Sequence, residues 1–259
     1  EQSMSMKVTQ LPAGASRAVY KNTSLDLRIY RRLQMFLHNE ALIDDATSLR
    51  DGEVSAFIRL GSDVKNNYYE YEIPLSVTPP KSNYSTYTRS DQYAVWAEAE
   101  ILDGDLDVFT TVKKNRNAQK LQGVPGVSYG ERFTEDDPSK PKNKVTVLGN
   151  PALSDVKVIM IGVRNNTGAT KECTVWADEL RVTDFDQDGG WAAKANMTLG
   201  MSDIATVNAG YHKETVGFGS VDQGLSNRNL DNYQRYNVAV QADLGRFLPK
   251  KVNLKAPVY

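Results

Sequence analysis

The sequence is poor in the residues that most often do chemistry. Its 259 residues include one cysteine and two histidines, and the formal net charge is −1. A single thiol, Cys173, excludes an intrachain disulfide, and we expect it to be a small buried residue. His38 and His212 are too far apart in the sequence to suggest a metal cluster. Lysine and arginine are scattered, which argues against a nucleic-acid partner. We expect no catalytic residues and no enzymatic activity.

Signals for export and for helical membrane insertion are also missing. The sequence contains no signal peptide, and no apolar run is long enough for a transmembrane helix. The chain opens in mid-sequence with Glu-Gln-Ser-Met and closes with Lys-Ala-Pro-Val-Tyr, where we expect another strand to begin. We therefore expect the chain to be an internal fragment of a longer protein.

What the sequence does contain is alternating hydrophobicity in its last third. Apolar residues alternate with polar or small ones in three runs, at residues 191–201, 205–212 and 236–244. Successive side chains of a strand point to opposite faces, so each run has one apolar and one polar face. The runs are 11, 8 and 9 residues long, close to the length of about 9–11 residues that a tilted strand needs to cross a bilayer. The pattern is typical of transmembrane β-strands.

Aromatic residues strengthen this interpretation. If the runs are consecutive antiparallel strands, Trp191, Tyr211 and Tyr236 share one end of the apolar face. Transmembrane barrels carry such an aromatic girdle where the lipid meets water. The polar faces would then line a hydrated interior, with Lys194, Asn196, Asn208, Gln241 and Asp243. The alternative is a soluble sandwich, whose strands also alternate.

Residues 1–183 have a different pattern of short strands separated by turn signals. Strands are expected at residues 33–37, 54–60, 69–75, 93–99, 144–148, 155–163 and 173–182. One short helix is expected within residues 104–121, and a charged loop at residues 131–143. Seven or more short strands at this spacing predict an all-β, antiparallel sandwich of the jelly-roll type. Residues 184–190 would join it to partial barrel strands at 191–259.

The acidic, glycine-rich junction is the best metal candidate. Asp184, Asp186, Asp188 and Gly189 match the start of a calcium loop, in which alternate carboxylates converge on one hard cation. Position twelve of the loop is Ala195 rather than glutamate, and no flanking helix pair is evident. The alternative is a solvated acidic turn. No other cofactor is expected.

Two further features have competing interpretations. Residues 176–182 resemble the last strand of carbohydrate-binding jelly rolls, but the adjacent Asp178 and Glu179 point to opposite faces and cannot form a glycosidase pair by themselves. We expect this strand to pack in the core through Trp176, Leu180 and Val182. Six tyrosines could form a binding surface or ordinary core contacts: Tyr68, Tyr69, Tyr71, Tyr84, Tyr87 and Tyr93.

Long stretches of the chain resemble one family of proteins. They include YRRLQMFLHNEAL, EVSAFIRLGSDVKNNYYEYEIPLSVTPP, TTVKKNRN, CTVWADELRVTDFDQDGGWAAKANMTLGMSDIATVNAGYHKETVGFG and GRFLPKKVNLKAPVY. These residues resemble the SprA/Sov family, giant outer-membrane proteins of Bacteroidetes. The resemblance implies a role as the translocon of the type IX secretion system, linked in some species to gliding motility.

The same resemblance implies partners and a location. The implied partners are a PorV-type shuttle protein, a plug protein and secreted cargo, and the implied location is the cell outer membrane. Barrel topology, with short periplasmic turns and longer external loops, places residues 1–183 on the extracellular side. The alternative function is that of a secreted or surface carbohydrate-binding β-sandwich.

Overall fold

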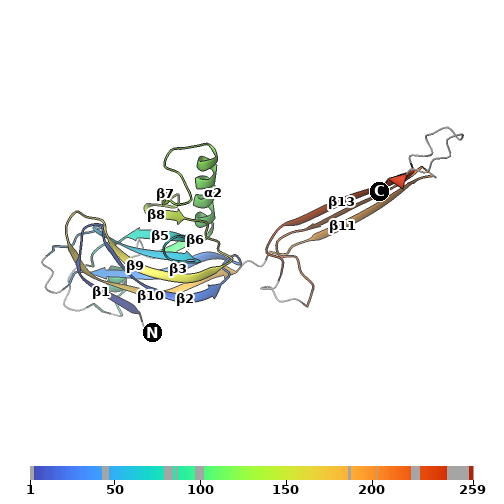
Figure 1. The fold of residues 1–259 in the computed structure, drawn as a ribbon. Coiled ribbons are helices and arrows are strands. Elements are labelled where there is room, and N and C mark those ends of the chain that lie inside the picture. Colours follow the sequence, from blue (N-terminus) through green and yellow to red (C-terminus); the bar gives the residue numbers. More distant parts are fainter. Residues whose placement is uncertain are drawn as a thin grey trace. The chain divides into compact units, whose positions relative to one another are not determined.

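The chain folds into two compact units, Glu1–Phe185 and Asp186–Tyr259 (Figure 1). The computed structural model describes residues 3–42, 47–78, 84–85, 87–96, 102–185, 188–202, 204–222, 228–243 and 257–258. Within these residues, no helix combines the length and the apolar character needed to cross a membrane.

The first unit is a sandwich of two antiparallel sheets (Figure 1). One sheet contains, in spatial order, β1 (Met4–Leu11), β10 (Lys171–Phe185), β3 (Tyr30–Glu40) and β6 (Leu102–Asp105). The other contains β2 (Ser16–Leu25), β9 (Val156–Asn165), β4 (Val54–Gly61), β5 (Tyr68–Pro74), β8 (Lys140–Leu148) and β7 (Phe133–Asp137). The predicted all-β, antiparallel sandwich is confirmed.

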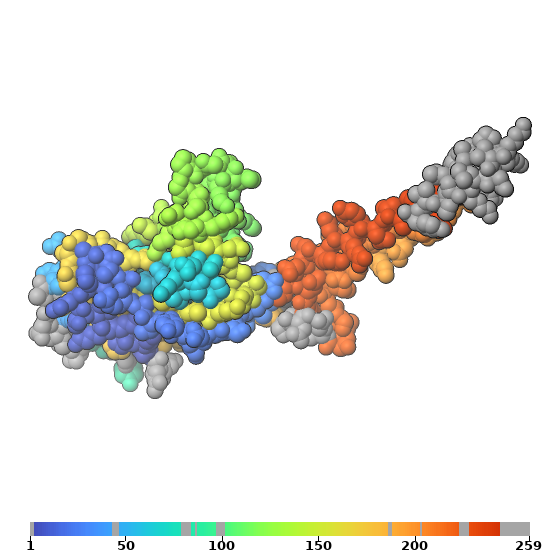
Figure 2. Space-filling view, viewed as in Figure 1, coloured from blue at the N-terminus to red at the C-terminus, as the bar shows by residue number. Residues whose placement is uncertain are grey.

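The core forms where alternate side chains of the two sheets face each other. Leu33, Met35 and Leu37 of β3 are buried, because each strand turns every second side chain inward. In β4 the core residues are Val54, Ala56, Ile58 and Leu60. Each fully buried side chain of this kind contributes about 1.5–3 kcal/mol. The helix α2 (Asp107–Leu121) projects from this unit in green in Figure 2 and places Phe109 at 5.4 Å from the ring of Tyr69.

Most strands lie where the sequence predicts them, and two local predictions are wrong. The strand predicted at residues 93–99 is wrong at its start: the helix α1 (Arg89–Val95) forms there, with Asp91 in its first turn, where a carboxylate suits the helix dipole, and residues 97–99 lie outside the described residues. Residues 131–143 are not a loop, because β7 and β8 pair there as a hairpin. Pro138 lies in its turn, where Asp137 accepts a hydrogen bond from the backbone of Ser139 at 2.8 Å.

The predicted inward face of β10 is also wrong at its start. The buried apolar residues here are Cys173, as expected, together with Val175 and Ala177, whereas Trp176 is only half-buried. A bulge between positions 178 and 181, with a positive φ of 48° at Glu179, then shifts the alternation. Leu180 is exposed as a result, and Val182 packs against the core.

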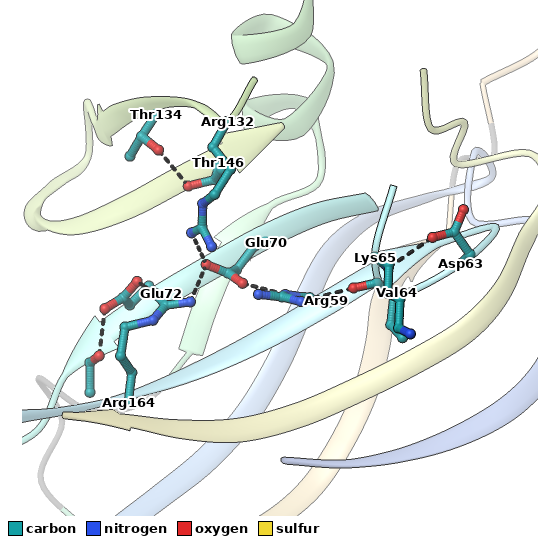
Figure 3. A network of polar contacts seen from close by, with 11 residues as sticks. Arg59, Asp63, Val64, Lys65, Glu70, Glu72, Arg132, Thr134, Thr146 and Arg164 are labelled. Atoms are coloured by element: carbon teal, nitrogen blue, oxygen red, sulfur yellow. Dashed lines mark hydrogen bonds and ion pairs between the residues drawn. The ribbon is translucent and has the colours of Figure 1, made fainter. Parts of the chain in front are cut away.

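A buried ion-pair network lies on the outer face of the six-stranded sheet (Figure 3). The carboxylate of Glu70 has no solvent exposure and pairs with Arg59, with Arg132 at 2.6 Å and with Arg164 at 2.8 Å. Burial by itself would raise the pKa of Glu70, but the three guanidinium charges outweigh it and hold the pKa below its usual value. Phe57 lies beneath two of these arginines.

The second unit contains one antiparallel sheet, with the order β11 (Ala192–Met201), β12 (Ala205–Glu214), β13 (Tyr233–Asp243) and β14 (Pro257–Val258). It appears as a narrow ribbon of strands in Figure 1. A tight turn joins β11 to β12, in which Ser202 has a φ of 47° and the backbone N–H of Ile204 donates to the carbonyl of Met201.

Candidate functional site

The register of β11, β12 and β13 brings their apolar residues onto one face. Residues directly opposite each other in an antiparallel pair project to the same side of the sheet. Starting at the β11–β12 turn, the rows on this face are Met201-Ala205-Ala242, Leu199-Val207-Val240, Met197-Ala209-Val238 and Ala195-Tyr211-Tyr236. We call this surface the apolar face.

The opposite surface, which we call the polar face, carries the complementary set. Its rows are Gly200-Thr206-Gln241, Thr198-Asn208-Ala239, Asn196-Gly210-Asn237 and Lys194-His212-Arg235. The five polar residues singled out from the sequence all lie on it: Lys194, Asn196, Asn208, Gln241 and Asp243. Thr198 donates to the side chain of Asn208 at 2.9 Å, so neighbouring strands are also linked by side chains.

Glycine at position 210 makes room for this polar face. A Cβ atom there would lie 2.5 Å from the side-chain oxygen of Asn237 and 3.3 Å from that of Asn196. The two amides can therefore approach the backbone of β12 only because no side chain stands between them.

The three aromatic residues gather at the end of the sheet away from the β11–β12 turn. Tyr211 lies directly opposite Tyr236. Trp191 precedes β11, and its backbone N–H donates to the hydroxyl of Thr215 at 2.8 Å while its carbonyl accepts from the backbone of Thr215 at 3.0 Å. The ammonium of Lys213 lies 5.1 Å from the Trp191 ring centroid. The sequence analysis did not single out Lys213. It could have been found as a charged residue at an apolar-face position, two residues after Tyr211.

The apolar face is open to solvent within the described part of the second unit. Exposed fractions are 53% for Trp191, 57% for Met197, 77% for Tyr236 and 68% for Val238. Soluble monomers rarely expose a continuous apolar surface of this kind. Trp191 and Met201 are ten residue steps apart, or about 34 Å, and a tilt of about 40° reduces this to a height of about 26 Å. The apolar band of a transmembrane barrel is about 25 Å tall.

The acidic junction is only partly described. Asp184 belongs to the end of β10, where its φ is 55° and its carboxylate lies 3.9 Å from Nε of Arg32. Asp188 is exposed, and Asp186 lies outside the described residues. The described residues contain no group of three or more histidine, cysteine or carboxylate side chains arranged to hold a metal ion. Calcium binding by the three aspartates stays a prediction.

The tyrosines of the first unit do not form a single surface. Tyr68, Tyr69 and Tyr71 are buried, whereas Tyr87 is 97% exposed and Tyr93 is 56% exposed. The hydroxyl of Tyr69 donates to the carbonyl of residue 151 at 3.1 Å, and burial raises its pKa to about 12. Tyr69 and Tyr71 belong to the core, and the ring of Tyr68 lies under the guanidinium of Arg59 at 4.2 Å.

Comparison with known proteins adds one finding. No curated protein matches the chain. The model of the SprA_N family, described as motility related/secretion protein, matches residues 1–259, which is the whole length. The resemblance seen in the sequence agrees with this match. The chain, with its β-sandwich and its sheet of one apolar and one polar face, therefore belongs to the SprA_N family of motility related/secretion proteins.

Proposed function

We propose that the chain is part of an outer-membrane translocon that passes folded cargo proteins to the cell surface in type IX secretion and gliding motility. In this proposal, residues 191–259 contribute strands to the wall of a β-barrel. The observation that carries it is the register of β11, β12 and β13, which collects the apolar residues of three strands on one exposed face. Family membership in the motility related/secretion group supports the same proposal.

The proposed mechanism is physical rather than catalytic. The apolar face contacts lipid, with Trp191, Tyr211 and Tyr236 at the lipid–water interface. The polar face lines a hydrated interior, where Asn196 and Asn208 offer hydrogen bonds to water. Transport then depends on the width of the pore, on gating and on partner docking. No nucleophile takes part.

Loop lengths give the proposed strands a direction. The β11–β12 connection is a tight turn at residues 202–204, and the β12–β13 connection spans residues 215–232. Bacterial barrels have short periplasmic turns and longer external loops. β11 therefore runs from the outside towards the periplasm, with Trp191 at the outer interface. The sandwich that precedes it belongs on the extracellular side.

The partners in this proposal follow from the family resemblance alone. They are a PorV-type shuttle protein, a plug protein and secreted cargo. A pull-down from a strain that produces the parent protein tests them, with recovery of all three classes as the expected result.

A matched pair of arginine substitutions tests the lipid contact. Met197→Arg places a charge near the middle of the apolar face, and Thr198→Arg places the same charge on the polar face one residue away. A lipid-facing arginine near the bilayer midplane costs about 2–4 kcal/mol. We expect Met197→Arg to lower the amount of parent protein folded in the outer membrane, and Thr198→Arg to leave it near the wild-type level. Equal effects of the two variants would contradict the proposal.

Protease treatment of intact cells tests the orientation. The turn of the β7–β8 hairpin, with Pro138 and Ser139 exposed, is a suitable cleavage site once a recognition sequence is inserted there. Cleavage in intact cells is the expected result. Cleavage only after rupture of the outer membrane would show that the sandwich lies on the periplasmic side.

A further inference from the structure

A polar recess lies beside the buried ion-pair network of the sandwich. It has a volume of about 540 Å³ and is lined by β5, β8, β9 and the turn after β9 through Glu72, Lys142, Lys144, Arg164, Asn166 and Thr167. Figure 3 shows Glu72 and Arg164 next to the Glu70 network. Gly14 and Gly52 also border the recess, and a Cβ atom on either would meet nothing within 4 Å. This part of the rim therefore leaves the recess open.

Positive charge dominates the recess and the network behind it. The side chains of Lys142, Lys144 and Arg164 carry three positive charges into the lining, and Glu72 is the one carboxylate among the described residues that line it. That carboxylate is engaged, because it pairs with Arg164 and accepts a hydrogen bond from Ser55 at 2.5 Å.

The network behind the recess does not neutralise this charge. Arg59 and Arg132 share the single carboxylate of Glu70 with Arg164. Asp136 of β7 lies opposite Lys144 in the register and offsets one further charge. The local balance stays positive in a chain whose formal net charge is −1.

Three side chains of the recess have unused hydrogen-bonding capacity. Among the described residues, the ammonium groups of Lys142 and Lys144 and the side-chain amide of Asn166 have no hydrogen-bond or ion-pair partner. Lysine ammonium groups bind carboxylates through charge-assisted hydrogen bonds. An asparagine amide offers one acceptor and two donor hydrogens, which complement the N–H and C=O of a peptide backbone.

We propose that this recess binds an acidic segment of another polypeptide. Lys142 and Lys144 receive its carboxylates, and Asn166 bonds its main chain. The volume lies within the range of about 300–1,000 Å³ that is typical of ligand sites. The amide of Asn166 favours a peptide over an inorganic anion, because a simple anion has no use for its acceptor oxygen. The site belongs to the sandwich, so this proposal does not rest on a membrane role for the second unit.

Fluorescence polarisation with the 259-residue chain in detergent micelles tests the proposal. The probe is a labelled octapeptide with four glutamates among glycines and serines, and the comparison probe has glutamines in their place. We expect the glutamate peptide to bind at least tenfold more tightly, with an affinity that falls as salt is added. Equal binding of the two peptides would overturn the proposal, as would inorganic triphosphate displacing the probe at a lower concentration than the unlabelled glutamate peptide.

Charge-matched variants locate the binding. Lys142→Glu/Lys144→Glu should weaken the glutamate peptide at least tenfold, and the neutral Lys142→Gln/Lys144→Gln should weaken it by a smaller factor. The control Lys7→Glu/Lys21→Glu makes the same change in net charge at exposed positions of β1 and β2 and should leave binding within twofold. Asn166→Ala should weaken it about threefold. Loss of binding in the control as large as in the recess variants would refute the site.

Discussion

The Glu70 network makes one prediction that can be worked through in detail. Glu70→Gln keeps the size of the side chain and one acceptor oxygen but removes the negative charge that three guanidiniums share. The NH₂ group of the new glutamine is a hydrogen-bond donor, and it cannot bond to the neighbouring guanidinium groups because they are donors as well. The substitution therefore leaves Arg59 and Arg132 without a carboxylate, while Arg164 keeps Glu72.

Burial sets the size of the effect. Glu70 has no exposed side-chain area and Arg59 is only 16% exposed, so water cannot replace the interaction that Arg59 loses, whereas Arg132 is 41% exposed and can be hydrated. Removing one partner of a buried ion pair typically costs about 3–5 kcal/mol. We expect the free energy of unfolding of the sandwich to fall by about this amount. With a urea m-value of about 2 kcal/mol/M, the midpoint should fall by about 1.5–2.5 M.

Urea unfolding of the 259-residue chain in detergent, followed by near-ultraviolet circular dichroism, measures the change. This signal reports on the fixed rings of the sandwich, including Tyr69 and Tyr71. Glu131→Gln is the control, because it makes the same chemical change at an exposed position next to Arg132 and should cost less than about 0.5 kcal/mol. A loss below about 1 kcal/mol for Glu70→Gln would refute the reasoning.

The pH dependence of the same pair of proteins gives an independent check. The folded-state pKa of Glu70 is lower than its ordinary value of 4.5. Its contribution to stability is therefore fully present above about pH 4.5 and is lost as the pH falls through the lower, folded-state pKa. The difference between wild type and Glu70→Gln should be constant from pH 7 to pH 5 and should shrink below pH 4.5. A difference that grows on acidification would contradict the assignment.

Three further predictions concern the sandwich. Gly162→Ala should destabilise it by about 1–3 kcal/mol, because the new Cβ would lie 2.4 Å from an aromatic ring carbon; the control Gly168→Ala, with nothing within 4 Å, should be near neutral in thermal melts. Tyr71→Phe should cost about 1–3 kcal/mol in urea unfolding, because the buried carboxylate of Asp137 loses a hydrogen-bond donor. Cys173, which is 1% exposed, should react with a thiol reagent only after denaturant is added, and rapid reaction of the native protein would contradict its burial.

The sequence predicted the strands well where one face of each strand is apolar. Residues 33–37 and 54–60 alternate strictly, and they became β3 and β4 because both sheets need a hydrophobic face to bury. The sequence-based prediction failed where the local structure did not follow the hydrophobic pattern. Residues 93–99 alternate, but α1 forms at their start. The charged β7–β8 hairpin has little apolar signal, and β1 and β2 were not predicted at all.

The candidate site divides in the same way. The alternation identified the two faces of each strand in the second unit from the sequence alone, because the period of a strand is two. The charged recess was not foreseen, because Lys142 of β8 and Arg164 of β9 are distant in the sequence. They line one recess only because β8 and β9 lie in the same sheet, with β4 and β5 between them. The bulge at Glu179 was likewise not foreseen: it shifts the alternation of β10, so that Cys173, Val175 and Ala177 face the core before it and Val182 packs against the core after it.

The sequence by itself determined that the chain is all-β, that its last third has one apolar and one polar face, and that aromatic residues stand at one end of it. The first two properties belong to single strands and follow from residue order, and the third also requires that consecutive strands run antiparallel. Only the tertiary structure decided the register that aligns Tyr211 with Tyr236, and the gathering of three arginines around Glu70. Both depend on which strands become neighbours, which the packing of whole sheets settles and no single segment encodes.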